Sequence, residues 1–136
     1  MLSLFAFNII GFKNYSEIYG YDFTDQLIFA VGKYLKEHGR LNGDTIVTTV
    51  MSNLGLYKAC DKIGMKYEKT AVGDKYVYSA MQENDYQLGG EQSGHIIIRK
   101  YATTGDGILT AIMLAEEICD TKLSLSELAE PVKLYP

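Results

Sequence analysis

Cysteine is scarce in this chain of 136 residues, which contains only Cys60 and Cys119. Each lies in a segment with helical spacing, and neither has a partner at the CxxC spacing of zinc and redox motifs. The sequence therefore argues against a disulfide framework or a zinc site. It predicts two buried, reduced thiols in a cytosolic protein.

Positive charge is also limited, because 13 Lys and Arg residues accompany 17 Asp and Glu residues and the formal net charge is −4. A broad nucleic-acid surface needs a basic face that displaces counterions, so no nucleic-acid partner is expected. The apolar start, residues 1–12, is too short to span a membrane and lacks the basic flank of a signal peptide. We therefore expect no membrane partner.

Internal repeats, low-complexity tracts and Pro/Gly/Ser-rich linkers are missing too. What remains is the composition of one globular domain, with 47% hydrophobic and 22% charged residues. Strand-like patterns cover residues 2–10, 45–51, 66–72, 86–88 and 95–101. Helix-like patterns cover residues 14–19, 24–38, 54–63 and 74–84, a long segment from Thr103/Thr104, and a short segment capped by Ser124 or Ser126 and ended by Pro131. This alternation predicts a single three-layer α/β domain, with a mixed sheet of about four to five strands and helices on both faces.

Capping residues mark several of these helices. Thr24 is the predicted N-cap of the helix over 24–38, and Asp74 that of the helix over 74–84. Gly64 is expected to end the helix over 54–63. The long helix is expected to bury four apolar side chains, namely Ile108, Leu109, Ile112 and Leu114.

Three polar loops follow predicted strands: Ser52-Asn53, Gly73-Asp74-Lys75 and residues 89–95, GGEQSGH. The carboxyl ends of strands are where such sheets place ligand loops. The glycines of GGEQSGH permit close backbone approach, and its carboxylate, amide, hydroxyl and imidazole match the donors and acceptors of vicinal sugar hydroxyls. The residues alone favour two interpretations equally: a sugar-binding loop, or a polar turn with a solvated glutamate.

The other loops carry weaker signals. The amino end of the helix after Gly73, together with Lys75, would suit a phosphate. Taken alone, the residues favour a simpler interpretation, in which Asp74 caps the helix and Lys75 is solvated. The segment 103–107, TTGDG, lacks P-loop spacing and is interpreted as a helix start with Asp106 in the first turn. No catalytic triad, metal cluster or paired-carboxylate geometry follows from the spacing.

Residues 24–136 resemble the third domain of bacterial phosphoglucosamine mutases, in the α-D-phosphohexomutase superfamily. The resemblance is carried by KYLKEHGRLNGDTIVTTVMSNLGLYKA, TAVGDKYV, LGGEQSGHIII, YATTGDGILTA and SLSELA. It implies that Glu91 and Ser93 bind the sugar hydroxyls. It also implies that the loop is shaped by Gly90, Gln92, Gly94 and His95. Asp74 and Lys75 would face the phosphosugar. Ser52 and Asn53 would lie toward the same cleft.

Members of this family interconvert glucosamine 6-phosphate and glucosamine 1-phosphate for cell-wall synthesis. Their chemistry uses a phosphoserine in the first domain, Mg²⁺ held by a DGDADR-type loop in the second, and a phosphate clamp in the fourth. None of these motifs occurs in this sequence. The resemblance therefore implies a cytoplasmic mutase fragment that binds a hexosamine phosphate, with no catalytic residue, metal ligand or cofactor of its own. Such a fragment is expected to be inactive alone and to self-associate through surface that the other domains cover.

Residues 1–25 are similar to a degenerate start of a diguanylate-cyclase (GGDEF) domain, within LFAFNIIGFKNYSEIYGYDFTDQLI. Asn8 occupies the position where the family has a metal-binding aspartate. Ser16-Glu17 replace the Asn-Asp pair that contacts the nucleotide, and the GGDEF loop is absent. Neither metal binding nor cyclisation is implied. The predicted division is therefore a GGDEF-like segment over 1–23 and a phosphohexomutase domain over 24–136. The alternatives to a mutase fragment are a non-catalytic phosphosugar-binding module and a degenerate GGDEF-type signalling domain.

Overall fold

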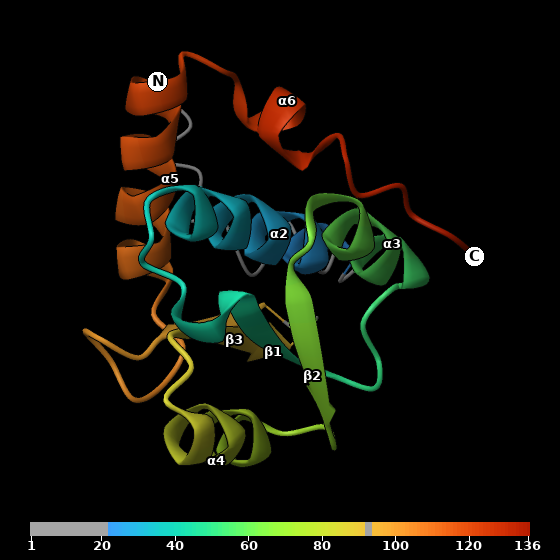
Figure 1. The fold of residues 1–136 in the computed structure, drawn as a ribbon, viewed down its shortest axis with the longest axis vertical. Helices are drawn as coiled ribbons and strands as arrows, with labels where there is room; N and C mark the ends of the chain where they lie inside the picture. Colours follow the sequence, from blue (N-terminus) through green and yellow to red (C-terminus); the bar gives the residue numbers. More distant parts are fainter. Residues whose placement is uncertain (1–21, 92–93) are drawn as a thin grey trace.

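The structure, a computed structural model, describes residues 22–91 and 94–136 (Figure 1). The predicted strand over 2–10 and helix over 14–19 lie outside these ranges. The described elements are α2 (Asp22–Glu37), the 3-10 helix η1 (Asn42–Asp44), β1 (Thr45–Thr49), α3 (Leu54–Ile63), β2 (Lys66–Thr70), α4 (Asp74–Asn84), β3 (Leu88–Glu91), β4 (His95–Ile98), α5 (Gly107–Thr121) and α6 (Leu125–Ala129).

The strands form one mixed sheet in the order β2-β1-β3-β4. β1 runs parallel to both β2 and β3, and β4 is antiparallel to β3. The central strand β1 is buried along its whole length, as expected for a parallel strand covered on both faces. The predicted three-layer α/β fold is confirmed, with four strands in the described part of the chain.

Helices cover both faces of the sheet (Figure 1). α4 lies below it, where Val47 and Ile97 pack with Val77 and Met81. α2 and α3 lie above it, and α5 and α6 contact α2. Neighbouring residues of one strand point to opposite faces, so Ile46 belongs to the upper core while Val47 belongs to the lower one.

The chain after α6 returns to α3. The side chain of Asn53 caps α3 by accepting a hydrogen bond from the Gly55 amide at 2.8 Å. The same side chain donates to the Tyr135 carbonyl at 2.8 Å and accepts from the Tyr135 amide at 3.0 Å. A Cβ atom at Gly55 would lie 1.8 Å from the Lys133 carbonyl oxygen, so this glycine lets the C-terminal segment lie directly on the helix.

Two predicted helix starts are wrong. Thr24 lies inside α2, which the structure describes from Asp22, and its side chain is buried. α5 begins at Gly107 rather than near Thr103, because Asp106 is its N-cap and accepts a hydrogen bond from the Leu109 amide at 3.0 Å. By contrast, α3 has its predicted bounds and ends at Gly64 in the left-handed conformation.

The predicted inner face of α5 is also partly wrong. Leu114 is buried and Leu109 packs against the core, but Ile108 and Ile112 are 57% and 51% exposed. The first half of α5 is apolar except for Thr110, so its sequence does not reveal which side faces the protein.

Strand β3 departs most from its prediction over 86–88, because Gly89, Gly90 and Glu91 continue the strand instead of starting a loop. Both neighbouring strands impose this conformation, since Gly89 pairs with β1 and all three residues pair with β4. A Cβ atom at Gly89 would lie 2.6 Å from Met81 Sδ. The glycine therefore allows α4 to pack closely on the sheet.

Cys60 and Cys119 are both free thiols. Cys60 is buried as predicted, but Cys119 is exposed. Among the described residues, no helix is long and apolar enough to cross a membrane.

Candidate functional site

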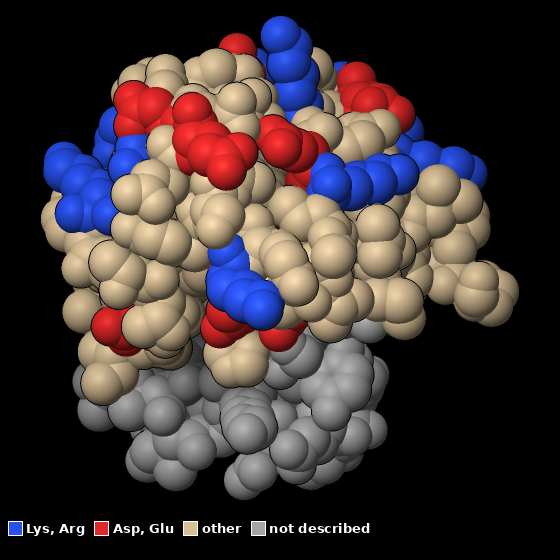
Figure 2. All heavy atoms as spheres, turned by 90° about the horizontal axis from the view of Figure 1, so that it is seen from below, with Lys and Arg blue, Asp and Glu red and all other residues tan. Residues whose placement is uncertain are grey.

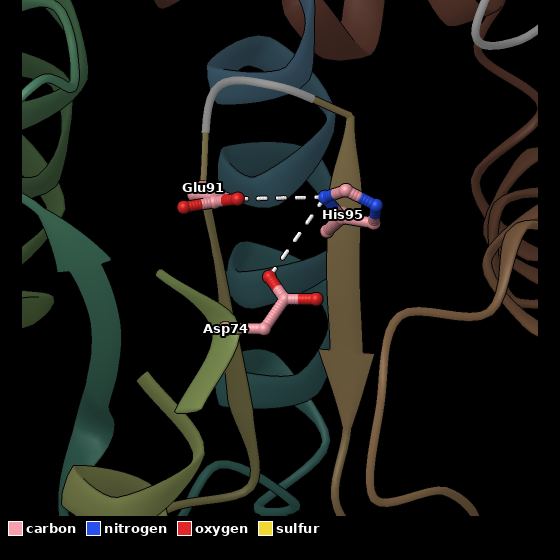
Figure 3. A group of neighbouring side chains, drawn as sticks. All are labelled: Asp74, Glu91 and His95. Carbon is pink, nitrogen blue, oxygen red and sulfur yellow. Dashed lines mark ion pairs between the residues drawn. The ribbon is translucent and has the colours of Figure 1, made fainter. Parts of the chain in front are cut away.

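Three side chains from different elements meet at the edge of the sheet where β3 ends and β4 begins (Figure 3). Glu91 is the last residue of β3, His95 is the first of β4, and Asp74 is the first of α4. His95 Nδ1 lies 3.4 Å from Glu91 Oε1 and 3.8 Å from Asp74 Oδ1. One ligand atom from each residue lies within 4.8 Å of the others.

Glu91 is held firmly in this arrangement. The residue is only 9% exposed, and its Oε2 accepts a hydrogen bond from the Gly73 amide at 3.1 Å. Gly73 is the N-cap of α4, so the carboxylate lies at the positive end of that helix. Its other oxygen, Oε1, lies toward His95.

Asp74 does not cap α4, contrary to its predicted role. The N-cap is Gly73, whose φ of 132° favours glycine and which has no side chain to cap the helix. The carboxylate of Asp74 lies toward His95 instead, and its Oδ1 is buried without a hydrogen-bond partner in the described part of the chain. Burial is the main cause that raises the pKa of Asp74; the His95 imidazole lowers this pKa and the Glu91 carboxylate raises it.

Glycines allow the β3–β4 hairpin to close around these side chains. A Cβ atom at Gly90 would lie 2.6 Å from the His95 carbonyl oxygen, and one at Gly105 would lie 3.1 Å from His95 Cβ. Gly94, between the strands, has a φ of 108°. The predicted glycine requirement of this segment therefore has specific physical causes.

The net charge of the cluster is negative. Two carboxylates and one imidazole sum to −2 when His95 is neutral and to −1 when it is protonated. Such a cluster attracts hydrogen-bond donors and cations and repels phosphate. At the amino end of α4, which the sequence suggested as one of two interpretations for a phosphate, the Gly73 amide is bonded to Glu91.

The remaining predicted site residues are placed differently. Lys75 is exposed, with its Nζ 4.9 Å from the Tyr76 ring centroid, and it is not part of the cluster. Ser52 is buried after β1, and the side chain of Asn53 is used in capping α3. Gln92 and Ser93 lie outside the described residues.

Sequence reasoning missed the pairing of Asp74 with Glu91 and His95. The residue spacing gave no paired-carboxylate geometry, and the resemblance placed these residues at one site without a direct contact between them. The available signal was topological, because the amino end of α4 and the carboxyl end of β3 meet at one edge of the sheet. The structure also gives a role to Asp25, whose buried carboxylate accepts a 2.6 Å hydrogen bond from the Asn53 amide and supports the loop after β1.

The cluster has the ligand types for a metal ion, since each of its residues offers one ligand atom. It is a poor match to Mg²⁺, which prefers oxygen ligands in a small octahedral shell, whereas one ligand here is an imidazole. The expectation that this chain holds no metal stays a prediction.

Charged side chains are interspersed on the face that carries α4. In Figure 2, Lys and Arg side chains alternate with Asp and Glu, and the coloured part of this face has no continuous basic area.

The chain matches the family model described as "Phosphoglucomutase/phosphomannomutase, alpha/beta/alpha domain III" over residues 23–135. It belongs to the phosphoglucomutase/phosphomannomutase family. Within that family, the chain corresponds to domain III, and the predicted resemblance of residues 24–136 is confirmed. The resemblance of the first residues to a GGDEF domain finds no support in the comparisons, and the division at residue 24 stays a prediction.

Relatives within the family are similar over the same region. A protein named "Phosphoglucosamine mutase" from Lachnospira eligens is 58% identical over 112 residues, which are 82% of this chain and 25% of that protein. A protein of the same name from Streptococcus pyogenes serotype M12 is 60% identical over 112 residues, again 82% of this chain and 25% of that protein. The chain thus spans about a quarter of the length of these phosphohexomutase relatives.

Solved structures of the family share the fold. A putative phosphomannomutase from Thermus thermophilus superposes with a TM-score of 0.71 at 25% identity, over 79% of this chain and 24% of that one. An N-acetylphosphoglucosamine mutase from Aspergillus fumigatus gives a TM-score of 0.64 at 16% identity, over 82% of this chain and 28% of that one. At 16% identity the likeness concerns the fold alone.

Proposed function

We propose that this chain supplies the sugar-binding surface of a phosphoglucosamine mutase. The observation that carries the proposal is the fixed carboxylate of Glu91, which is bonded to the Gly73 amide on one side and faces His95 on the other. A carboxylate whose direction is fixed by its surroundings is suited to accept hydrogen bonds from vicinal hydroxyls. The names of the similar proteins from L. eligens and S. pyogenes support a hexosamine phosphate as the ligand.

The residues divide into binding and shaping roles. Glu91 and Ser93 bind sugar hydroxyls, and Asp74 and His95 complete the polar surface around Glu91. Gly90, Gln92 and Gly94 shape the hairpin, while the exposed Lys75 lies at the rim, where it is free to meet a phosphate.

This chain alone does not turn over substrate. Phosphoryl transfer needs a phosphoryl donor, a cation and a clamp on the reorienting sugar phosphate. The resemblance assigns the phosphoserine, Mg²⁺ and the clamp to parts of the enzyme outside this chain. The complete enzyme would act in the cytoplasm, in the synthesis of peptidoglycan precursors.

The binding role is tested by titrating the ¹⁵N-labelled chain with glucosamine 6-phosphate and following amide shifts. Shifts are expected around residues 73–75 and 90–95, and the Glu91→Gln variant should lose them. Glu83→Gln, an exposed change on α4 with the same loss of charge, should keep them. Absence of shifts at about 10 mM ligand, which would fill even a 1 mM site, contradicts the proposal.

The lack of turnover is tested by complementation. A mutase-deficient bacterium that expresses only this chain should fail to grow without added amino sugar. Growth would show that the chain carries catalytic groups not recognised in its sequence.

Exposed apolar side chains next to the site support contact with other domains. Val50 and Met51 follow β1 and Val72 follows β2, with exposures of 62%, 56% and 55%. The Val50 amide bonds to the Thr70 carbonyl at 2.9 Å, which brings these two strand ends together. In isolation this apolar surface should cause self-association, which sedimentation at increasing concentration would detect and which Met51→Lys should weaken. A wild-type chain that stays monomeric would refute the proposed self-association.

A further inference from the structure

The candidate sugar site contains one carboxylate more than hydroxyl recognition needs. Glu91 alone offers the acceptor oxygens that neutral hydroxyls require, yet Asp74 brings a second carboxylate to the same point. We infer that Asp74 is a specificity residue, which selects sugars carrying a positively charged amino group by pairing with that group beside Glu91. This inference rests on the proposed sugar-binding function.

The charge of Asp74 is only partly offset within the described residues. Its Oδ1 is enclosed and has no hydrogen-bond partner there, although the side chain as a whole is 34% exposed, and the imidazole of His95 lies 3.8 Å from this oxygen. A buried carboxylate oxygen without a donor is costly, and a ligand that supplies a charged donor recovers part of that cost. The raised pKa of Asp74, caused first by burial, agrees with this partly buried position beside a second carboxylate.

The spacing of the cluster suits an ammonium group. Oxygens of Asp74 and Glu91 lie within 4.8 Å of each other, so one nitrogen between them can approach both at about 2.8 Å. A neutral amide or hydroxyl would form hydrogen bonds there but would leave both negative charges in place. Selection therefore comes from charge more than from shape.

The charge of the cluster disfavours anionic ligands but not other cations. The net negative charge repels phosphate, which must lie away from the cluster, as at the rim near Lys75. A divalent metal ion is the competing cationic ligand, and its binding is an explicit outcome of the test below.

The experiment compares three ligands on the same ¹⁵N-labelled chain: glucosamine 6-phosphate, glucose 6-phosphate and N-acetylglucosamine 6-phosphate. They share the phosphate and ring but differ in charge at one position. The wild-type chain should bind the first about tenfold more tightly than the other two, the ratio expected from one charge-assisted hydrogen bond.

Variants then locate the source of that ratio. In Asp74→Asn, the ratio of the dissociation constants for glucose 6-phosphate and glucosamine 6-phosphate should fall from about ten to about one. Glu83→Gln removes one negative charge from the exposed face of the same helix and should keep the ratio of the wild type. Because Asp74 does not cap α4, its replacement removes no helix-capping bond.

Each outcome decides a question. Equal affinity of the wild-type chain for all three sugars overturns the selection by Asp74 while the sugar-binding function stands, and this arm requires no variant to fold. No binding of any sugar overturns both. Titration with Mg²⁺ or Zn²⁺ alone that shifts residues 74, 91 and 95, together with equal sugar affinities, would assign the cluster to a metal ion instead.

Discussion

Glu117 is a buried carboxylate on α5, and replacing it should stabilise the protein at neutral pH. The residue is 3% exposed, and its Oε1 has no hydrogen-bond partner in the described part of the chain. Burial raises the pKa of Glu117 to about 8, with a further increase from Glu37 of α2 and an opposing effect from Lys33. The folded protein therefore prefers the protonated carboxyl well above the usual pKa of 4.5.

The direction of the pH effect follows from this raised pKa. The folded state binds the proton more tightly than the unfolded state, so the contribution of Glu117 to stability is complete below pH 4.5. It is lost as the pH rises toward 8. Each unit of difference corresponds to 1.36 kcal/mol, so the loss between pH 5 and pH 7.5 is about 3 kcal/mol. A neutral glutamine keeps the shape of the side chain and avoids this loss.

The assay is urea unfolding of the wild-type chain and Glu117→Gln at pH 5 and pH 7.5. The variant should be similar to the wild type at pH 5 and more stable by about 3 kcal/mol at pH 7.5. Glu83→Gln, an exposed substitution of the same type, should follow the wild-type pH profile. If Glu117→Gln also runs parallel to the wild type across this range, the carboxyl is not protonated in the folded state and the reasoning fails.

Three further predictions concern packing, thiol chemistry and capping. Gly90→Ala should destabilise the chain by about 1–3 kcal/mol in urea unfolding, because the new Cβ meets a backbone oxygen that cannot move aside. Gly107→Ala, which meets no atom within 4 Å, should cost little. A thiol reagent should modify the exposed Cys119 in the native chain and reach Cys60 only after denaturation, since Cys60 is buried and its pKa is raised to about 12, chiefly by burial. Asn53→Ala should cost about 1–2 kcal/mol, because α3 loses its cap.

Contrary results have clear meanings. Equal stabilities of the Gly90 and Gly107 variants would show that the hairpin tolerates a side chain. Two reactive thiols in the native chain would indicate local opening around Cys60. An unchanged stability of Asn53→Ala would mean that water replaces the cap.

Local signals predicted those parts of the fold that local chemistry determines. The helix over 54–63 carries its own apolar spacing and its own terminating Gly64, and its predicted bounds are those observed. Ser124, one of the two caps that the sequence suggested, likewise caps α6 with a reciprocal bond to Glu127.

Features set by distant partners could not be predicted in this way. Gly89 and Gly90 are strand residues because β1 and β4 pair with them, against their own weak preference. The exposed side of α5 depends on where α2 lies. The first half of α5 is almost entirely apolar, so its sequence does not indicate which side α2 covers. The candidate site shows the same division, since the loop containing Glu91 and His95 was identified from the sequence, whereas Asp74 joins them only when α4 packs against β3.

The C-terminal segment that lies on α3 has a practical consequence for labelling and fusion. Tyr135 is bonded to Asn53 through both its amide and its carbonyl, and Lys58 Nζ lies 4.3 Å from the Tyr135 ring centroid. A fluorophore or a second protein attached after Pro136 would therefore start from a fixed point beside α3 and not from a freely moving tail. Distances measured from such a tag would report the geometry of the domain itself, whereas Asn53→Ala would release the tag and broaden those distances.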